Sequence, residues 1–510
     1  MTDLTRRDAL ALGALLGGSA ALAGVGAAAA APSAPGVPLD TLPSLPVIRS
    51  RNGVLRTTLV ATPRPTRLIG QVTQGLWTYN GLFSGPCLRA APGDRIDITI
   101  RNEVSVPVNI HYHGLWVSPS GQADNVFVEA APGESLQSRL TIPRSHQGGL
   151  FWIHPHVHGY SNEALWRGLS GTFIIDGGVV DLPEYRGCRH RVLVFKGFAL
   201  DPAAATPTML PVDQASAELV QFAVNGALNP TMVMRPGETQ VWSLANTAND
   251  GFLRIAMDDH RMTVLAEDGY ASFTTRKVRE YVLAPGARVA LAVTASTKPG
   301  AYALRSLGYD NGQFGQWLPQ TLATVHVGGR PRTPVRAPAR IMPVVSWLKE
   351  EPVKRRVFTL SASFTPETGP VFYINGKAFD HQDMHASFDV EVDTMEEWVV
   401  RTDPSLQQGG VVEGHPFHVH VAHFAVVGRG RWDPATGEAT SYHAVEPYGL
   451  EDTAQVDAWE YLVMRLKFHK FTGKTVLHCH ILLHQDRGMM GVFRIVKPGA
   501  GGGEDEHHHH

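Results

Sequence analysis

Short alternating segments separated by turn signals are the feature that most restricts how this chain can fold. Ile96, Ile98 and Ile100 alternate with polar residues, a period of two that is typical of β-strands with one buried face. Turn-forming pairs recur between such runs, at Pro92-Gly93, Pro132-Gly133, Pro236-Gly237 and Pro285-Gly286. No long amphipathic helical pattern competes with them. The sequence therefore predicts an all-β protein made of antiparallel β-sandwiches.

A weak internal repeat divides the chain into three parts. Asn80-Gly81 and Asn225-Gly226 are each followed by a Pro-Gly turn, and Asn375-Gly376 opens a third copy. A chain of 510 residues suits three domains at about 150 residues each. The boundaries are expected near residues 181–187 and in the Pro/Arg-rich linker 329–343. The predicted domains are 45–178, 188–330 and 343–498, followed by a disordered tail or tag at 499–510.

Residues 1–31 are typical of a twin-arginine signal peptide. Arg6-Arg7 precede an Ala/Leu/Gly run and a small-residue stretch that invites cleavage. A transmembrane anchor is the alternative, but Ala and Gly are only weakly apolar. We expect export by the twin-arginine machinery to the periplasm, the bacterial cell surface or the medium, with no stable membrane anchor. This route carries proteins that are already folded.

Charge and cysteine content exclude several classes of protein. Lys plus Arg number 45 against 47 Asp plus Glu, so no basic surface for nucleic acid is expected. Only Cys87, Cys188 and Cys479 are present, which excludes a disulfide-rich scaffold. Cys87 and Cys188 either pair with each other or remain two inert thiols. We expect a monomer.

Ten histidines gather in four short clusters, which carry the chemistry. The clusters are His111-Tyr112-His113, His154-Pro155-His156, His415-Pro416-Phe417-His418-Val419-His420, and His478-Cys479-His480 with His484 following. Residues i and i+2 of a strand point to the same face, so each His-x-His pair presents two imidazoles to one space. Four pairs supply eight imidazoles. A single pair would be weak evidence, but four in one chain indicate a metal centre.

The Cys479 thiolate should face away from its two flanking histidines. His415 lies three residues before His418, so in an extended strand it falls on the opposite face and can meet Cys479. His484 and Met489 complete a set of two histidines, one cysteine and a weak thioether, which selects copper in a blue electron-transfer site. Structural zinc suits one cysteine among many histidines poorly. Met489 could instead be core packing, the role that we assign to Met490.

These four motifs, in this order, resemble those of the multicopper oxidase family over nearly the whole mature chain. The resemblance implies three cupredoxin-like Greek-key β-sandwich domains and four copper ions. It implies a type 1 copper in the third domain, held by Cys479, His415, His484 and Met489. It implies a type 2 copper on His111 and His418. The implied type 3 pair uses His113, His154 and His480 on one ion, and His156, His420 and His478 on the other.

The same resemblance implies that the trinuclear cluster lies between the first and third domains, braced by the middle one. Asp124 is the candidate acid that supplies protons, with a surface-loop role as its alternative. His158 is expected to be structural or to support the ligands. The chain departs from the pattern of bacterial cuprous oxidases at Gln485, where those relatives often carry a carboxylate. A second proton relay is therefore in doubt.

The predicted reaction is one-electron oxidation of a donor at the type 1 copper, coupled to four-electron reduction of dioxygen to water. Electrons pass through Cys479 to His478 and His480. Related cuprous oxidases often carry a methionine-rich insertion before the third histidine cluster, and Met384 and Met395 alone do not make one. The resemblance therefore favours phenols and aryl amines over copper(I) as electron donors. A cuprous oxidase in copper tolerance is the alternative. A non-catalytic exported scaffold is disfavoured because every ligand is present, and a two-domain nitrite reductase is disfavoured by length.

Overall fold

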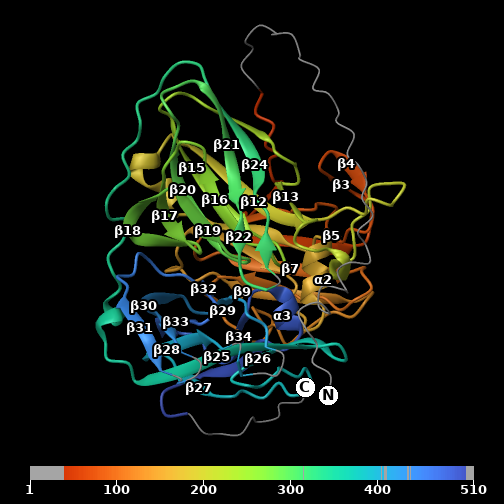
Figure 1. Cartoon of the computed structure of the whole chain (residues 1–510), viewed down its shortest axis with the longest axis vertical. Helices are drawn as coiled ribbons and strands as arrows, with labels where there is room; N and C mark the ends of the chain where they lie inside the picture. The colour runs from red at the N-terminus through yellow and green to blue at the C-terminus, as the bar shows by residue number, and fades with distance from the viewer. Residues whose placement is uncertain are drawn as a thin grey trace. The chain divides into compact units, whose positions relative to one another are not determined.

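β-Strands make up nearly all the regular structure of residues 39–500, which the computed structural model describes except for 314, 404, 407–409, 434–435 and 437 (Figure 1). The helices in this part are short: α2 (Ser161–Arg167), α3 (Leu482–Asp486), and the 3-10 turns η1 (Val179–Asp181), η2 (Pro183–Tyr185), η3 (Val212–Gln214) and η4 (Ser346–Lys349). The all-β prediction is confirmed. The predicted signal peptide and residues 501–510 of the tail lie outside the described residues.

The first β-region consists of two sheets around one core. One sheet has the order β1 (Val47–Arg49), β6 (Cys87–Ala90), β11 (Gly171–Ile175), β10 (Gly149–His154) and β8 (His111–His113). The other has the order β5 (Thr78–Tyr79), β2 (Val54–Thr62), β7 (Arg95–Asn102) and β9 (Ser135–Thr141). Between β2 and β5 in the sequence, β3 (Thr66–Leu68) and β4 (Gln71–Thr73) form a separate two-stranded hairpin. Ile96, Ile98 and Ile100 of β7 are fully buried between the sheets, as their alternation predicts.

The middle β-region has a six-stranded and a five-stranded sheet. The first has the order β13 (Gln221–Val224), β12 (Arg189–Phe198), β15 (Thr239–Asn246), β20 (Arg288–Thr294), β17 (Met262–Glu267) and β18 (Tyr270–Val278). The second has the order β14 (Thr231–Met234), β24 (Gln320–Val327), β21 (Gly300–Leu307), β16 (Leu253–Met257) and β19 (Glu280–Leu283). A short ladder joins β22 (Tyr309–Asp310) and β23 (Gln316–Trp317).

The third β-region repeats the strand order of the middle one. Its six-stranded sheet runs β26 (Gly369–Ile374), β25 (Lys354–Thr365), β28 (Met395–Thr402), β33 (Glu460–Lys467), β30 (Phe424–Trp432) and β31 (Ala439–Ala444). Its five-stranded sheet runs β27 (Asp389–Glu391), β35 (Met490–Val496), β34 (Gly473–Cys479), β29 (His415–Val419) and β32 (Thr453–Val456). In the three regions β8, β16 and β29 therefore take equivalent places, as do β10, β21 and β34.

The three Asn-Gly pairs form the same turn in each region. Asn80, Asn225 and Asn375 have φ of 55°, 51° and 52°, and each following glycine also has positive φ. In each turn the asparagine Oδ1 accepts a hydrogen bond from a backbone N–H of the first long strand, at 2.8, 2.8 and 2.7 Å. Asn and Gly tolerate this left-handed conformation best, which explains why the repeat is visible in the sequence.

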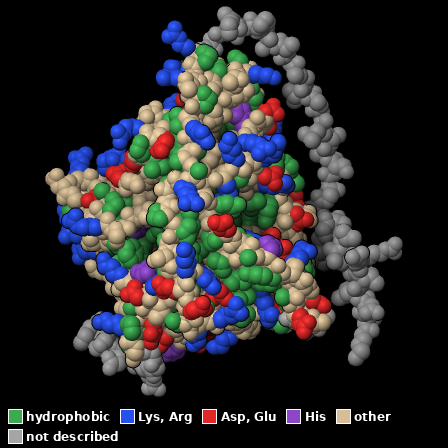
Figure 2. Space-filling view, turned by 90° about the vertical axis from the view of Figure 1, so that its left-hand side faces the viewer, with side chains coloured by type: hydrophobic (Ala, Val, Ile, Leu, Met, Phe, Trp, Pro, Cys, Tyr) green, Lys and Arg blue, Asp and Glu red, His purple; other side chains and the backbone are tan. Residues whose placement is uncertain are grey.

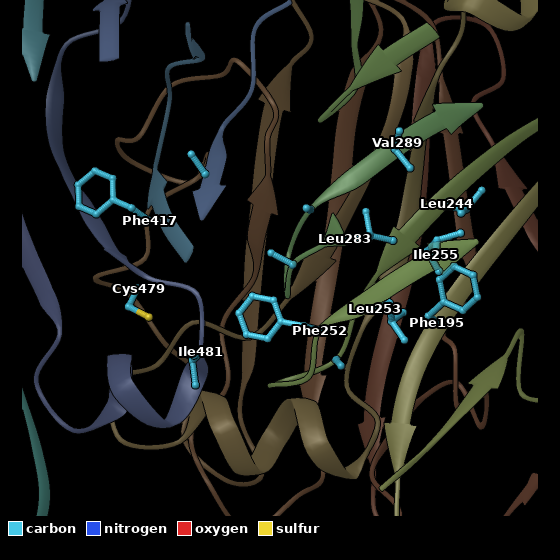
Figure 3. Packing of buried hydrophobic residues seen from close by; sticks show 14 of the residues in the cluster. Phe195, Leu244, Phe252, Leu253, Ile255, Leu283, Val289, Phe417, Cys479 and Ile481 are labelled. Carbon is cyan, nitrogen blue, oxygen red and sulfur yellow. The ribbon is translucent and has the colours of Figure 1, made fainter. Parts of the chain in front are cut away.

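One apolar core continues from the middle region into the third. It includes Phe252 and Leu283 from the middle region and Phe417, Cys479 and Ile481 from the third. Figure 3 shows Cys479 between Phe417 and Ile481, beside helix α3. The described residues of all three β-regions belong to a single structural unit. The region that holds Cys479 therefore shares a continuous apolar core with its neighbour.

The state of the cysteines and the length of the helices bear on two further expectations. Cys87, Cys188 and Cys479 are all free thiols, so the alternative in which Cys87 pairs with Cys188 is wrong. Cys87 is buried in a small apolar cluster with Leu150 and Ile174, whereas Cys188 packs against a different one. No helix in the described part is long and apolar enough to cross a membrane. Acidic and basic side chains are interspersed on the face that Figure 2 shows.

Candidate metal centre

Two equivalent strand pairs, one in the first region and one in the third, carry the clustered histidines. In the first region β8 pairs with β10, which places His113 opposite Trp152 and His111 opposite His154. In the third region β29 pairs with β34, which places His418 opposite His478. Because cross-strand partners share a face, each pair presents its imidazoles on one side of its sheet.

Eight imidazoles from these two regions converge, and we call this group the histidine centre. Its members are His111, His113, His154, His156, His418, His420, His478 and His480, and each is at most 2% exposed. His478 Nε2 lies 3.1 Å from His156 Nε2 and 3.2 Å from His420 Nε2. On the other side, His113 Nδ1 lies 3.1 Å from His480 Nε2. Each of these contacts except that between His420 and His478 joins the first region to the third.

The protonation of these rings suits metal binding. His111, His154 and His418 each bond an oxygen through Nδ1, to Asp124, Pro155 and Asp452 respectively. Their Nε2 atoms are buried without a hydrogen-bond partner among the described residues. A Nδ1–H that donates to oxygen fixes the tautomer and leaves the Nε2 lone pair free for a cation. Burial also lowers the pKa of His111 and His154 well below its usual range, so both rings are neutral.

A second group, the sulfur site, consists of Cys479, His415, His484 and Met489. Cys479 Sγ lies 3.8 Å from His415 Nδ1 and 3.5 Å from His484 Nδ1, and these two nitrogens are 3.1 Å apart. His415 thus reaches the face of Cys479, opposite to that of His418. Burial raises the pKa of the Cys479 thiol well above its ordinary value, so the thiolate requires a cation beside it.

Met489 and Met490 point into different surroundings. Met489 is fully buried in the apolar core that contains Cys479, and its backbone carbonyl accepts the Cys479 N–H at 3.1 Å. Met490 packs instead against Val476 and Val492. Met489 therefore shares the core cluster and a backbone contact with Cys479, which is compatible with its predicted role as a weak axial ligand, and Met490 does not.

Asp124 lies directly behind the histidine centre. Its carboxylate bonds His111 Nδ1 at 2.9 and 3.1 Å and accepts the Tyr112 N–H at 2.9 Å. It is 3% exposed, and burial raises its pKa to about 8. A surface-loop role for Asp124 is therefore wrong, because its partner is one of the clustered histidines.

Sequence reasoning missed Asp452, which has no histidine motif around it. Its carboxylate lies 3.1 Å from His113 Nε2, and its backbone carbonyl accepts from His418 Nδ1 at 2.8 Å. It is fully buried. Burial raises the pKa of this carboxyl, but Arg288 and His113 outweigh burial and hold it well below the usual range. The only local signal was a charged pair, Glu451-Asp452, at the start of a strand.

The middle region does more than brace the other two. Arg288, at the start of β20, bonds both Asp452 oxygens at 2.9 and 2.7 Å. Trp152, which stacks on His154 with ring centroids 4.3 Å apart, donates its indole N–H to Gly286 O at 3.2 Å. A Cβ on Gly286 would lie 2.8 Å from the His480 ring. The middle region therefore contacts the histidine centre without offering it an imidazole.

His158, Gln485 and Asp486 lie beside the centre and take other partners. His158 is half-buried against Phe379, with ring centroids 4.7 Å apart. Gln485 is fully buried and donates to Ser161 Oγ at 3.1 Å. Asp486 accepts backbone N–H bonds from Gly159 and Asn162 at the start of α2. These bonds fasten α3, which carries His484, to the first region.

A cavity of about 480 Å³ opens beside His484 between the middle and third regions. Trp317, Phe364 and Phe372 form apolar walls, and Phe372 stacks on the His484 ring with centroids 3.9 Å apart. Glu413 and Asp250 also line it, and Glu413 Oε1 lies 3.3 Å from His484 Nε2. Burial raises the pKa of Glu413 to about 8 and that of Asp250 to about 6. A small molecule in this cavity would meet the edge of the sulfur site.

Comparison with known proteins agrees with this arrangement. Three domain families, each described as "Multicopper oxidase", match residues 61–178, 201–329 and 350–499. The chain is 24% identical to a multicopper oxidase of Staphylococcus aureus, over 88% of this chain and 90% of that one. It is also 24% identical to a laccase of Bacillus subtilis (strain 168), over 83% and 90%.

Solved structures share the fold. A multicopper oxidase from Campylobacter jejuni, described as a metallo-oxidase, superposes with a TM-score of 0.74 at 24% identity, covering 90% of this chain and 94% of that one. One from Pediococcus acidilactici gives 0.72 at 22% identity, covering 94% and 95%. The prediction of three cupredoxin-like domains is confirmed.

Proposed function

Since the chain belongs to the multicopper oxidase family, whose members are oxidoreductases that use dioxygen, we propose that it oxidises small phenols and aryl amines. The observation that carries this proposal is the cavity beside His484. Its aromatic walls suit a flat ring, and its acidic side chains suit a phenolic hydroxyl or an amine. Sites of this kind fix the orientation of a ligand with a few polar groups on an apolar surface.

Four copper ions fit the donors of this chain. Cys479, His415, His484 and Met489 would hold a type 1 ion, and His111 and His418 a type 2 ion. A type 3 pair would take His113, His154 and His480 on one ion and His156, His420 and His478 on the other. The orphaned imidazole nitrogens and the buried thiol support this assignment. When bound, these ions supply one-electron acceptance from the donor and four-electron reduction of dioxygen.

Residues of the chain are suited to both the oxidation of the donor and the reduction of dioxygen. Phe372 stacks on one face of the His484 ring, and Asp250, whose pKa of about 6 leaves it ionised near pH 7, can accept a proton from a bound phenol. Cys479 is covalently continuous with His478 and His480, so a few bonds connect the sulfur site to the histidine centre. Asp124 can hold a proton next to His111, at the edge of the histidine centre.

Oxidation of copper(I) is the second candidate. The acidic side chains of the cavity could attract a cation, but soft copper(I) prefers sulfur ligands. Among the described residues that line the cavity there is no methionine or cysteine. This composition favours the aromatic donors.

Steady-state turnover tests the proposal. A phenol, an aryl amine and cuprous ion would each be supplied to the copper-loaded protein while oxygen uptake is recorded. We expect the highest kcat/KM with one of the two aromatic donors. A higher value for cuprous ion would replace this proposal with a copper-tolerance function.

We also propose that residues 1–31 direct export by the twin-arginine route. Arg6-Arg7 and the apolar run after them support this. Replacing both arginines by lysine should leave the protein in the cytoplasmic fraction of a bacterial host. Unchanged export of that variant would exclude the route.

A further inference from the structure

Arg288 is a fully satisfied buried cation next to the histidine centre. Its side chain is 1% exposed and makes five hydrogen bonds. Two of them form a fork with the carboxylate of Asp452, and the other three end on the carbonyls of Leu150, Gly286 and Asp268. An arginine in this geometry fixes a carboxylate in position as well as in charge.

Asp452, the partner of Arg288, touches histidines from two regions. Its carboxylate bonds His113 Nε2 of the first region at 3.1 Å, and its carbonyl bonds His418 Nδ1 of the third at 2.8 Å. Thr453 Oγ1 donates to the same carboxylate at 2.8 Å. His113 therefore keeps its proton on Nε2 and turns Nδ1 toward the other rings.

The space around this pair leaves no room for a different arrangement. A Cβ on Gly114, the residue after His113, would lie 2.1 Å from an Arg288 nitrogen and 2.5 Å from an Asp452 oxygen. Gly114 has a φ of 83°, which also favours glycine. The backbone that follows His113 thus lies directly against the ion pair.

Burial makes Asp452 depend on Arg288. Loss of Arg288 would remove the fork that orients the buried Asp452 carboxylate and the cation that compensates it. Asp268 lies nearby, with its Oδ1 3.4 Å from an Arg288 nitrogen, and accepts the backbone N–H of Asp452. Without Arg288, two buried carboxylates would face each other.

We propose that Arg288 is a positioning residue of the dioxygen-reducing centre. It holds Asp452 in place so that the Asp452 carboxylate orients His113 and the Asp452 backbone carbonyl orients His418, although the region of Arg288 supplies no ligand. This inference rests on the copper assignment proposed above. It does not depend on which donor the enzyme oxidises.

The test compares copper-loaded full-length variants by copper content, visible absorption and electron paramagnetic resonance. Arg288→Met keeps the length of the side chain and removes its charge and donors. We expect fewer than four copper ions per chain, an altered type 2 signal and at least tenfold lower oxygen consumption. The blue absorption should persist, because Arg288 makes no contact with the sulfur site. Arg288→Lys keeps the charge without the fork and should be intermediate.

Arg191 of the same region provides a matched control. It is 5% exposed and bonds Asp40 and Gln240, far in sequence from any clustered histidine. Arg191→Met should lower thermal stability and leave the type 2 signal and the copper count unchanged. If Arg288→Met matches Arg191→Met in both of these readouts, the proposal is overturned.

A variant without either charge covers the case in which Arg288→Met does not fold. Arg288→Met/Asp452→Asn removes both members of the pair, so the Asp452 carboxylate is not left buried without its cation. It should fold, keep its blue colour and show the altered type 2 signal. A wild-type type 2 signal in this variant would refute the positioning role. A wild-type protein that binds no copper would instead refute the copper assignment itself.

Discussion

Cys479 connects the sulfur site with the histidine centre. Its thiol is fully buried within 4 Å of two imidazole nitrogens, while the residues on either side of it belong to the histidine centre. Strand alternation separates the two faces, and the peptide bonds between them keep the sites connected. Among the described residues, only Cys479 belongs to one site and has members of the other as both chain neighbours.

Cys479→Ser should abolish the blue absorption and the oxidase activity together. A hydroxyl of nearly the same size keeps the packing but is a poor copper ligand. Visible spectra and oxygen uptake would measure both effects, and circular dichroism would show a retained fold. Cys87→Ser, at another buried thiol, is the control and should keep colour and activity. Activity in Cys479→Ser would contradict the proposed electron route.

Lys196 makes stability depend on pH. It is fully buried with one hydrogen bond, to Ser170 Oγ at 2.9 Å, and burial lowers its pKa from 10.5 to about 7. The unfolded chain binds this proton more tightly, so the destabilisation is full below pH 7 and disappears as pH rises toward 10.5. Each pKa unit is worth about 1.4 kcal/mol.

Lys196→Met should therefore raise the free energy of unfolding at pH 7, by a few kcal/mol at most, and by progressively less up to pH 10. Denaturant unfolding of both proteins at four pH values would measure the difference. Part of the gain is offset because Ser170 loses its partner. A difference that is constant with pH would show that Lys196 is not the titrating group.

At the scale of elements, the same strand positions serve different purposes in the three regions. β8 and β29 carry histidines, whereas the equivalent β16 buries Leu253, Ile255 and Met257 in the apolar core. The Asn-Gly turn recurs in all three because it closes the hairpin beside the first long strand. The equivalent strands thus differ in what they carry, whereas the turn is the same in all three regions.

Asn375→Ala should lower the free energy of unfolding by about 2 kcal/mol. Alanine is strained at a φ of 52°, and the substitution removes the hydrogen bonds from Thr359 N and to Val357 O. Asn375→Gly removes only the hydrogen bonds and should cost about half as much. Equal losses in the two variants would mean that backbone strain contributes nothing.

At the scale of the whole molecule, the two sites draw their donor atoms from different numbers of regions. The sulfur site takes every donor from the third region, but the histidine centre takes four imidazoles from the first region and four from the third. Metal bound in the histidine centre would therefore crosslink regions that are distant in sequence. Its binding free energy would add to the stability of the folded state.

Removal of copper by a chelator should lower the melting temperature. The unfolded chain has no preformed site, so bound ions stabilise only the native state. Calorimetry of the loaded and stripped protein would give the shift. Cys479→Ser should keep most of this shift, because the histidine centre is intact in it. A shift that disappears in Cys479→Ser would place the stabilisation in the sulfur site.

The sequence by itself determined the strands, the three-fold repeat and the histidine clusters. These follow from local rules: period-two alternation, left-handed Asn-Gly turns, and the shared face of residues i and i+2. His111 and His113 needed only their spacing to be recognised as a pair.

Only the tertiary structure decided which groups surround those histidines. Asp452, Arg288 and Gly286 carry no local pattern, and Arg288 lies 164 positions before its partner. The number of cysteines likewise could not decide whether Cys87 and Cys188 pair or remain free thiols. Such contacts depend on how sheets from different regions pack, and a buried charge becomes meaningful only when its compensating partner is placed beside it.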